Sequence, residues 1–72
     1  MKEQEAVDLN TQHPFLRSVL RMVDAGKPIG SESPFWDTYL IARQRGLVHR
    51  VGADGKTIES SDRAEQFRNL LR

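Results

Sequence analysis

Residues 47–60 read Leu-Val-His-Arg-Val-Gly-Ala-Asp-Gly-Lys-Thr-Ile-Glu-Ser, and they contain the strongest local structural signal in the chain. Two short runs that favour β-structure, 47–51 and 56–60, flank residues 52–55, which include the pair Asp54-Gly55. Asp-Gly is typical of tight hairpin turns, because such turns need residues that tolerate positive φ. The stretch therefore predicts a two-stranded antiparallel hairpin. Since an isolated hairpin is only marginally stable, we expect helices to pack against it.

A first helix is predicted to begin at Pro14, with Thr11 or His13 as its cap. Proline suits the first helical position, because its missing N–H would have no partner there. From Phe15 onward, apolar residues recur at helical spacing. Gly26 can adopt the left-handed conformation that ends many helices, so we expect the first helix to stop there.

A second helix is predicted from Ser33, whose hydroxyl can cap it, to about Arg45, where Gly46 ends it. A last helix follows the hairpin, with candidate caps over residues 60–62 and an apolar stripe over residues 64–71. The predicted fold is therefore α+β. It is a small single domain of order α-α-β-β-α, in which the helices pack on a two-stranded antiparallel hairpin.

Residues 1–12 are polar and acidic and show no periodic pattern. We therefore expect a flexible acidic tail over 1–12 and a single domain over 13–72. The tail has one lysine and three carboxylates, a charge of −2, and the other residues have 10 basic and 7 acidic side chains, a charge of +3. That charge is small for a protein that binds nucleic acid through many phosphate contacts.

The composition limits the class of protein. Seventy-two residues support one core, and the absence of cysteine fits a reducing cytosol. There is no signal-peptide pattern, and no apolar run approaches the roughly 20 residues that cross a bilayer. We therefore expect a cytoplasmic protein with no membrane partner.

No catalytic, metal-binding or cofactor-binding motif stands out in the sequence. His13 and His49 have no carboxylate partners at metal-ligand spacing. The serines offer no nucleophile–base–acid set, and no glycine-rich phosphate loop precedes a helix. We expect a protein that is not an enzyme and uses no cofactor.

The second predicted helix is the most informative element for binding. Positions 100° apart place an aromatic-rich set on one broad face: Phe35, Trp36, Tyr39, Leu40 and Ala42. Arg43 falls in the middle of this face. One interpretation is a core face on which the Arg43 stem rests while its charged head reaches water. The other is a partner-binding surface, because Trp, Tyr and Arg are enriched in binding hot spots.

Basic side chains supply the other candidates. Arg17 and Arg21 are spaced i, i+4 on the polar side of the first helix, where they form either a solvated face or a contact to phosphate or to an acidic protein surface. A second group lies at the end of the second helix and in the hairpin: Arg43, Arg45, His49, Arg50 and Lys56. With Trp36, these two groups are the candidate partner-binding residues.

The segment Tyr39-Leu40-Ile41-Ala42-Arg43-Gln44-Arg45-Gly46-Leu47-Val48-His49-Arg50, followed by Asp54-Gly55-Lys56, resembles the end of a winged-helix domain. In that family a helix closes with a Gly-Leu-Val type strand start, and a hairpin wing follows. The resemblance implies that residues 43–45 lie on or near the recognition helix and that Lys56 lies at the wing tip near a backbone phosphate. It covers residues 39–56. A winged helix normally has three helices before the wing, whereas only two are predicted here.

Small size, composition and the shortened winged-helix pattern also resemble the small proteins with which bacteriophages take over their hosts. Some of those proteins bind bacterial RNA polymerase. The resemblance implies a non-enzymatic transcription regulator that binds the host RNA polymerase in the cytoplasm and alters its activity. One alternative is a winged-helix DNA-binding repressor or accessory factor. Another is a phage inhibitor of a different host complex.

Overall fold

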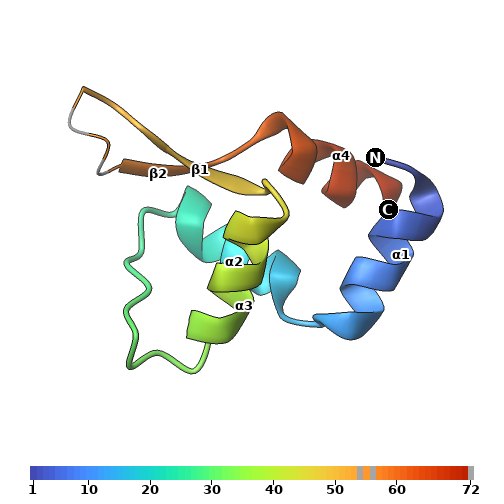
Figure 1. Ribbon diagram of the computed structural model, residues 1–72, viewed down its shortest axis with the longest axis horizontal. Coiled ribbons are helices and arrows are strands. Elements are labelled where there is room, and N and C mark those ends of the chain that lie inside the picture. Colours follow the sequence, from blue (N-terminus) through green and yellow to red (C-terminus); the bar gives the residue numbers. More distant parts are fainter. Residues whose placement is uncertain (54, 56, 72) are drawn as a thin grey trace.

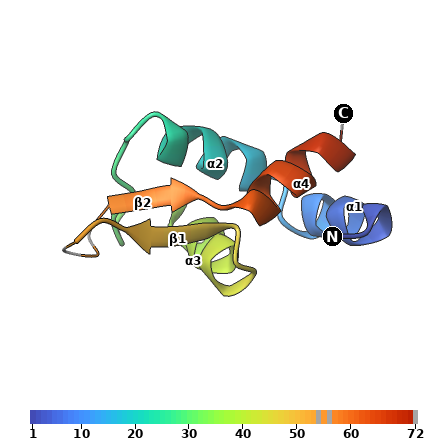
Figure 2. The same ribbon diagram turned by 90° about the horizontal axis from the view of Figure 1, so that it is seen from above.

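The computed structural model describes residues 1–53, 55 and 57–71. Its elements, in chain order, are α1 (Glu3–Gln12), α2 (Leu16–Asp24), α3 (Trp36–Gln44), β1 (Val48–Val51), β2 (Thr57–Ser60) and α4 (Asp62–Leu70). The α+β class and the antiparallel hairpin agree with the prediction, and the order is α-α-α-β-β-α. The hairpin extends from one end of the molecule, and α1 lies at the other end (Figure 1, Figure 2).

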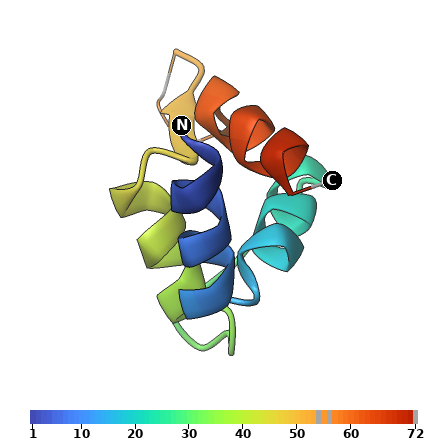
Figure 3. The same ribbon diagram turned by 90° about the vertical axis from the view of Figure 1, so that its right-hand side faces the viewer.

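The prediction of a flexible tail over residues 1–12 is wrong, because Glu3–Gln12 form helix α1. Two carboxylates, Glu3 and Glu5, lie in its first turn, where the helix dipole favours negative charge. Its buried residues are Ala6 and Leu9, a pattern too sparse to be recognised as an amphipathic helix in the sequence. The helix lies across the end of the molecule (Figure 3) and packs against α4. The domain therefore includes the residues that were assigned to a tail.

Polar contacts tie α1 to α4 at two places. The Glu5 carboxylate forms an ion pair with Arg63, and the amino group of Met1 donates a hydrogen bond to Gln66 Oε1 at 2.8 Å.

Helix α2 starts later than predicted. Pro14 lies in the turn that follows α1, and α2 begins at Leu16 rather than at Pro14. The predicted start of the first helix therefore shifts by two residues.

Glycines end α2 and α3, as predicted. Gly26 has φ 71° and Gly46 has φ 72°, both in the left-handed region. After Gly46 the chain turns back, and the Leu47 N–H donates to the Ala42 carbonyl at 2.8 Å. Leu47 is thereby placed in the core, with none of its surface exposed.

Helix α3 starts later than predicted. Ser33 Oγ accepts a hydrogen bond from the Phe35 N–H at 3.1 Å, and the regular helix begins at Trp36. The Ser33 hydroxyl therefore orders the turn before the helix rather than capping α3 itself.

The hairpin pairs Val48 with Ser60 and Val51 with Thr57. Because side chains alternate along a strand, Val48 and Ile58 share the face that packs on the core, while Val51 lies on the other face. The turn contains Gly52 at φ 89° and Gly55 at φ 64°, consistent with the predicted need for positive φ. Asp54, part of the predicted turn, lies outside the described residues.

One hydrophobic core joins all these elements. Its largest fully buried side chains are Phe67, Leu16, Leu20, Leu47 and Val19. Ser61 caps α4, since its hydroxyl accepts from the Ala64 N–H at 3.3 Å, and it also donates to the Gly46 carbonyl at 2.6 Å. The start of α4 is thus held against the end of α3.

Among the described residues, no helix has the length and apolar character needed to cross a membrane.

Candidate partner-binding surface

Helix α3 uses one side for the core and leaves the other side open. Tyr39 and Ala42 are buried, whereas Asp37, Arg43 and Gln44 are exposed. The aromatic-rich face predicted from the sequence is therefore divided. Its centre belongs to the core, and its edge reaches solvent.

Three residues at that edge, Trp36, Leu40 and Arg43, are spaced i, i+4, i+7, and we call them the α3 stripe. Trp36 and Leu40 are partly exposed and Arg43 is exposed. The Trp36 ring lies 5.5 Å from the Tyr39 ring between centroids, and the Arg43 guanidinium carbon lies 6.0 Å from the centroid of the Tyr39 ring. The buried tyrosine thus supports an indole on one side and a cation on the other. This arrangement agrees with the first interpretation of Arg43, since the residue rests beside a core aromatic ring while it stays exposed. Its role in binding a partner stays a prediction.

A second aromatic contact lies before α2 and α3. Phe15 and Phe35 meet edge to face, with ring centroids 5.8 Å apart and planes at 82°. Phe15 is 55% exposed, more than the other exposed large apolar residue, Val7, at 41%. It was predicted to belong to the apolar stripe of the first helix, but that stripe begins with Leu16. The shifted start of α2 leaves the Phe15 ring at the surface.

The predicted basic residues do not form one surface. Arg17 and Arg21 are exposed on α2, which packs beside β2, whereas Arg43 and Arg45 lie at the end of α3, beside β1. Figure 2 shows α2 and α3 on different sides of the hairpin. The two arginine pairs therefore belong to separate faces.

The basic residues of the hairpin are also divided. His49 and Arg50 are both exposed, but neighbouring residues in a strand point to opposite faces. His49 pairs with Glu59 across the hairpin, and Arg50 pairs with Ile58. Lys56, the predicted wing-tip contact, lies outside the described residues.

Arg45 lies close to α1, which the sequence did not predict. It lines a shallow hollow together with Glu5 and Asp8 of α1, and its carbonyl accepts a hydrogen bond from Arg63 Nε at 3.0 Å. The acidic side chains of α1 therefore offset part of the positive charge at the end of α3. The proximity of Arg45 to Glu5 and Asp8 depends on where α1 packs. It could therefore not be predicted from the sequence of residues 43–45.

The described residues contain no cluster of three His, Asp or Glu side chains that could hold a metal ion. The candidate site is thus a surface made of one aromatic cluster on α3 with arginines at its edge. Comparisons of the chain with protein-family models, with curated proteins and with solved structures find no match.

Proposed function

We propose that the protein is a small non-enzymatic transcription regulator that acts by binding a protein partner through the α3 stripe. The observation that carries this proposal is the exposure of Trp36, Leu40 and Arg43 along one side of α3, with Trp36 and Arg43 supported by the Tyr39 ring. Tryptophan and arginine are the residue types that most often dominate binding energy at protein interfaces. Side chains held in place before binding lose little conformational entropy when the partner arrives.

The first turn of α3 favours a protein over DNA as the partner. A recognition helix contacts base edges with residues near its N-terminus. In α3 this turn presents Trp36 and the exposed carboxylate of Asp37. A carboxylate repels the phosphate backbone, and the whole chain carries a net charge of only +1.

Bacterial RNA polymerase is the partner that we propose, and the host cytoplasm is the location. The support is the resemblance in size and composition to small bacteriophage regulators of that enzyme. Arg43 and Arg45 would pair with acidic groups on the polymerase surface, while Trp36 and Leu40 would supply apolar contact area.

The test is capture of purified bacterial RNA polymerase by the tagged protein, in the presence of nuclease. The double variant Arg43→Ala/Arg45→Ala should weaken capture by about tenfold or more. The double variant Arg17→Ala/Arg21→Ala removes the same charge from α2 and should leave capture unchanged. Circular dichroism should report the wild-type helical content for both variants.

Equal losses from the two double variants would contradict the proposed surface, because they would indicate a response to net charge alone. If wild-type protein fails to capture the polymerase, the proposed partner is wrong.

A winged-helix DNA-binding function is the second candidate, and one observation favours it. Helix α1 brings the number of helices before the hairpin to three, which is the number in a winged-helix domain, whereas the sequence predicted two. In this case Arg50 and Arg45 would contact phosphates, and affinity for duplex DNA would fall steeply with salt. Retention of nuclease-sensitive DNA, without a stoichiometric protein, would favour this second function.

A further inference from the structure

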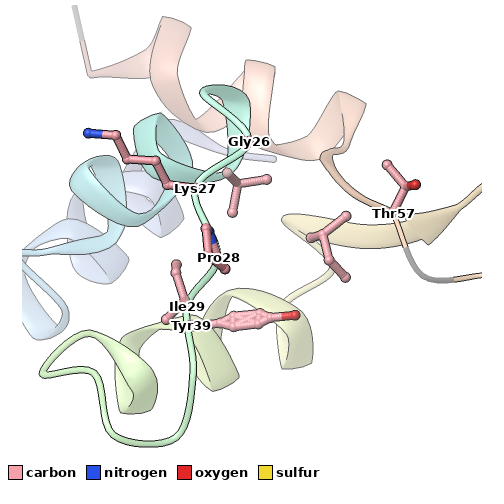
Figure 4. Close-up of a pocket in the computed structure, with 8 residues that line it drawn as sticks. Gly26, Lys27, Pro28, Ile29, Tyr39 and Thr57 are labelled. Atoms are coloured by element: carbon pink, nitrogen blue, oxygen red, sulfur yellow. The ribbon is translucent and has the colours of Figure 1, made fainter.

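Two hollows of the surface contrast in their chemistry. The hollow beside β2 lies between the end of α2, the connector after it and the first residues of β2, and it is lined mainly by apolar groups such as Pro28 and the Tyr39 ring (Figure 4). The hollow beside Arg45 is charged instead, with the carboxylates of Glu5 and Asp8 in its lining. Because charged groups select a partner of complementary charge, the hollow beside Arg45 is the more specific of the two.

The carboxylates of α1 lie beside arginines from two other segments. Glu5 forms an ion pair with Arg63 of α4, and Arg45, at the end of α3, lines the hollow together with Glu5 and Asp8. Arg63 Nε also donates to the Arg45 carbonyl at 3.0 Å, so the two arginines are neighbours. Helix α1 carries three carboxylates and no basic side chain, with Lys2 directly before it. The contact between α1 and the rest of the domain is therefore acidic on the α1 side and basic on the other.

Helix α1 is held to this basic surface by few contacts. It has ten residues, fewer than an isolated helix needs to be stable in water, so its helical structure depends on packing. Its buried residues are Ala6 and Leu9, and no side chain caps its N-terminus. The buried Asn10 Oδ1 accepts no hydrogen bond from the described residues, and an acceptor that gains no donor on burial opposes packing. Local opening is expected where few apolar side chains are buried, which favours detachment of α1 from an otherwise folded domain.

We infer that the surface under α1 is a docking site for an acidic helix of the protein partner, and that α1 occupies this site in the free protein. The partner's helix would replace α1 and carry carboxylates at the spacing of Glu5 and Asp8, three residues apart on one helix face. These carboxylates would bind Arg63 and Arg45 as α1 does. Apolar residues at the positions of Ala6 and Leu9 would fill the same space.

The connection of α1 to the domain sets the condition for this exchange. Three residues, 13–15, join α1 to α2, so α1 remains at a high effective concentration near its site. A partner helix must therefore gain free energy from a second contact, which the α3 stripe supplies. The inference rests on the proposed function, since it names a second surface for the same partner, and Arg45 belongs to both surfaces.

The probe for the exchange is a synthetic peptide of residues 1–12 with a free amino terminus, titrated into the isotope-labelled full-length variant Leu9→Ala. Truncation of Leu9 loosens the variant's own α1, so the peptide should bind in its place and shift the amides of Ala64 and Phe67 in α4. Wild-type protein should bind the peptide about tenfold more weakly or less, because its own α1 fills the site. Val7→Ala truncates an exposed side chain of the same helix and should behave as wild type does.

Two variant peptides test the role of charge. The Glu5→Gln peptide should bind the Leu9→Ala protein about threefold more weakly, because it loses the pair with Arg63. The Glu3→Gln peptide loses the same charge outside the hollow and should bind as the unchanged peptide does. Equal losses from the two peptides would overturn the inferred pairing.

Amide hydrogen exchange of the wild-type protein tests detachment without any variant. We expect the amides of Leu9 and Asn10 to be less protected than those of Leu20 and Phe67. Equal protection at all four amides would overturn the inference, because α1 would then open only with the whole domain. Equal binding of the peptide to wild-type and Leu9→Ala protein, or unchanged α4 amides in the variant, would overturn it as well. None of these measurements uses the polymerase, so a failed polymerase capture and a failed exchange of α1 remain distinguishable.

Discussion

Phe67 shows how one residue sets the stability of so small a core. It is the largest of the fully buried side chains, and Leu20 is also fully buried. Leu20 belongs to the apolar residues that recur at helical spacing after Phe15, and Phe67 belongs to the apolar stripe predicted over residues 64–71. In a chain of 72 residues, the loss of either side chain removes a large part of the total stability.

We expect Phe67→Ala to lower the free energy of unfolding by about 3–5 kcal/mol and Leu20→Ala by about 2–5 kcal/mol. The physical reason is lost apolar burial together with the cavity that remains. Urea unfolding monitored by circular dichroism measures both effects. Asn69→Ala, at an exposed position of the same helix, is the control and should change stability little. Wild-type stability of the Phe67 variant would contradict the packing of α4 described above.

At the scale of elements, helix α1 is held against the domain by an ion pair and by the burial of apolar side chains, which differ in strength. The Glu5–Arg63 ion pair joins side chains that are each 40% exposed, and Leu9 is 3% exposed. Exposed ion pairs contribute little because water screens the charges and both side chains lose freedom. Burial of a leucine contributes more, so apolar contact should dominate.

This comparison gives a prediction for two variants of α1. Leu9→Ala should lower the free energy of unfolding by about 2–3 kcal/mol, whereas Glu5→Gln should lower it by about 1 kcal/mol or less. Denaturant unfolding gives the stabilities, and amide hydrogen exchange within α1 shows whether the helix detaches first. A larger effect of Glu5→Gln would mean that the ion pair, rather than burial, positions α1.

At the scale of the whole molecule, Asp24 links three elements. Its carboxylate accepts a hydrogen bond from Ser60 Oγ at 2.6 Å and forms an ion pair with Arg68 at 2.7 Å. The contacts join the end of α2 to β2 and to α4. Arg68 also pairs with Glu65 at 3.3 Å, so the charges form a small network.

We expect Asp24→Asn to destabilise the protein by about 0.5–1 kcal/mol at low salt, because the side chain is partly exposed and the amide can still accept from Ser60. The difference from wild type should shrink in about 1 M salt, where exposed charges are screened. Thermal unfolding at the two salt concentrations measures this change. A difference that does not respond to salt would show that packing, rather than charge, links the three elements.

The winged-helix resemblance also belongs to the scale of the molecule. In the described residues α3 ends at Gln44, β1 begins at Val48 and β2 begins at Thr57, which agrees with the predicted order of helix and hairpin. The winged-helix relationship itself stays a prediction. The candidate basic residues were predicted as two groups along the chain, and the structure places the arginines of α2 and those at the end of α3 on different faces. Their distribution depends on how α2, α3 and the hairpin pack, which spacing along the chain does not encode.

The sequence by itself determined where the elements end. Gly26, Gly46 and the glycines of the hairpin turn adopt positive φ, a property that depends on the residue and its immediate neighbours. The ends of α2 and α3 and the position of the hairpin could therefore be predicted, as could the buried positions of Leu20 and Phe67.

Only the tertiary structure decided the existence of α1 and the shape of the candidate site. Ala6 and Leu9 give too weak a pattern to predict a helix, and α1 packs against α4, more than fifty residues away in the chain. The exposure of Phe15, the support of Trp36 and Arg43 by Tyr39, and the hollow beside β2 all depend on contacts between separate elements. Burial is a property of the packed molecule, and so a local pattern can indicate an apolar face without showing which part of it remains at the surface.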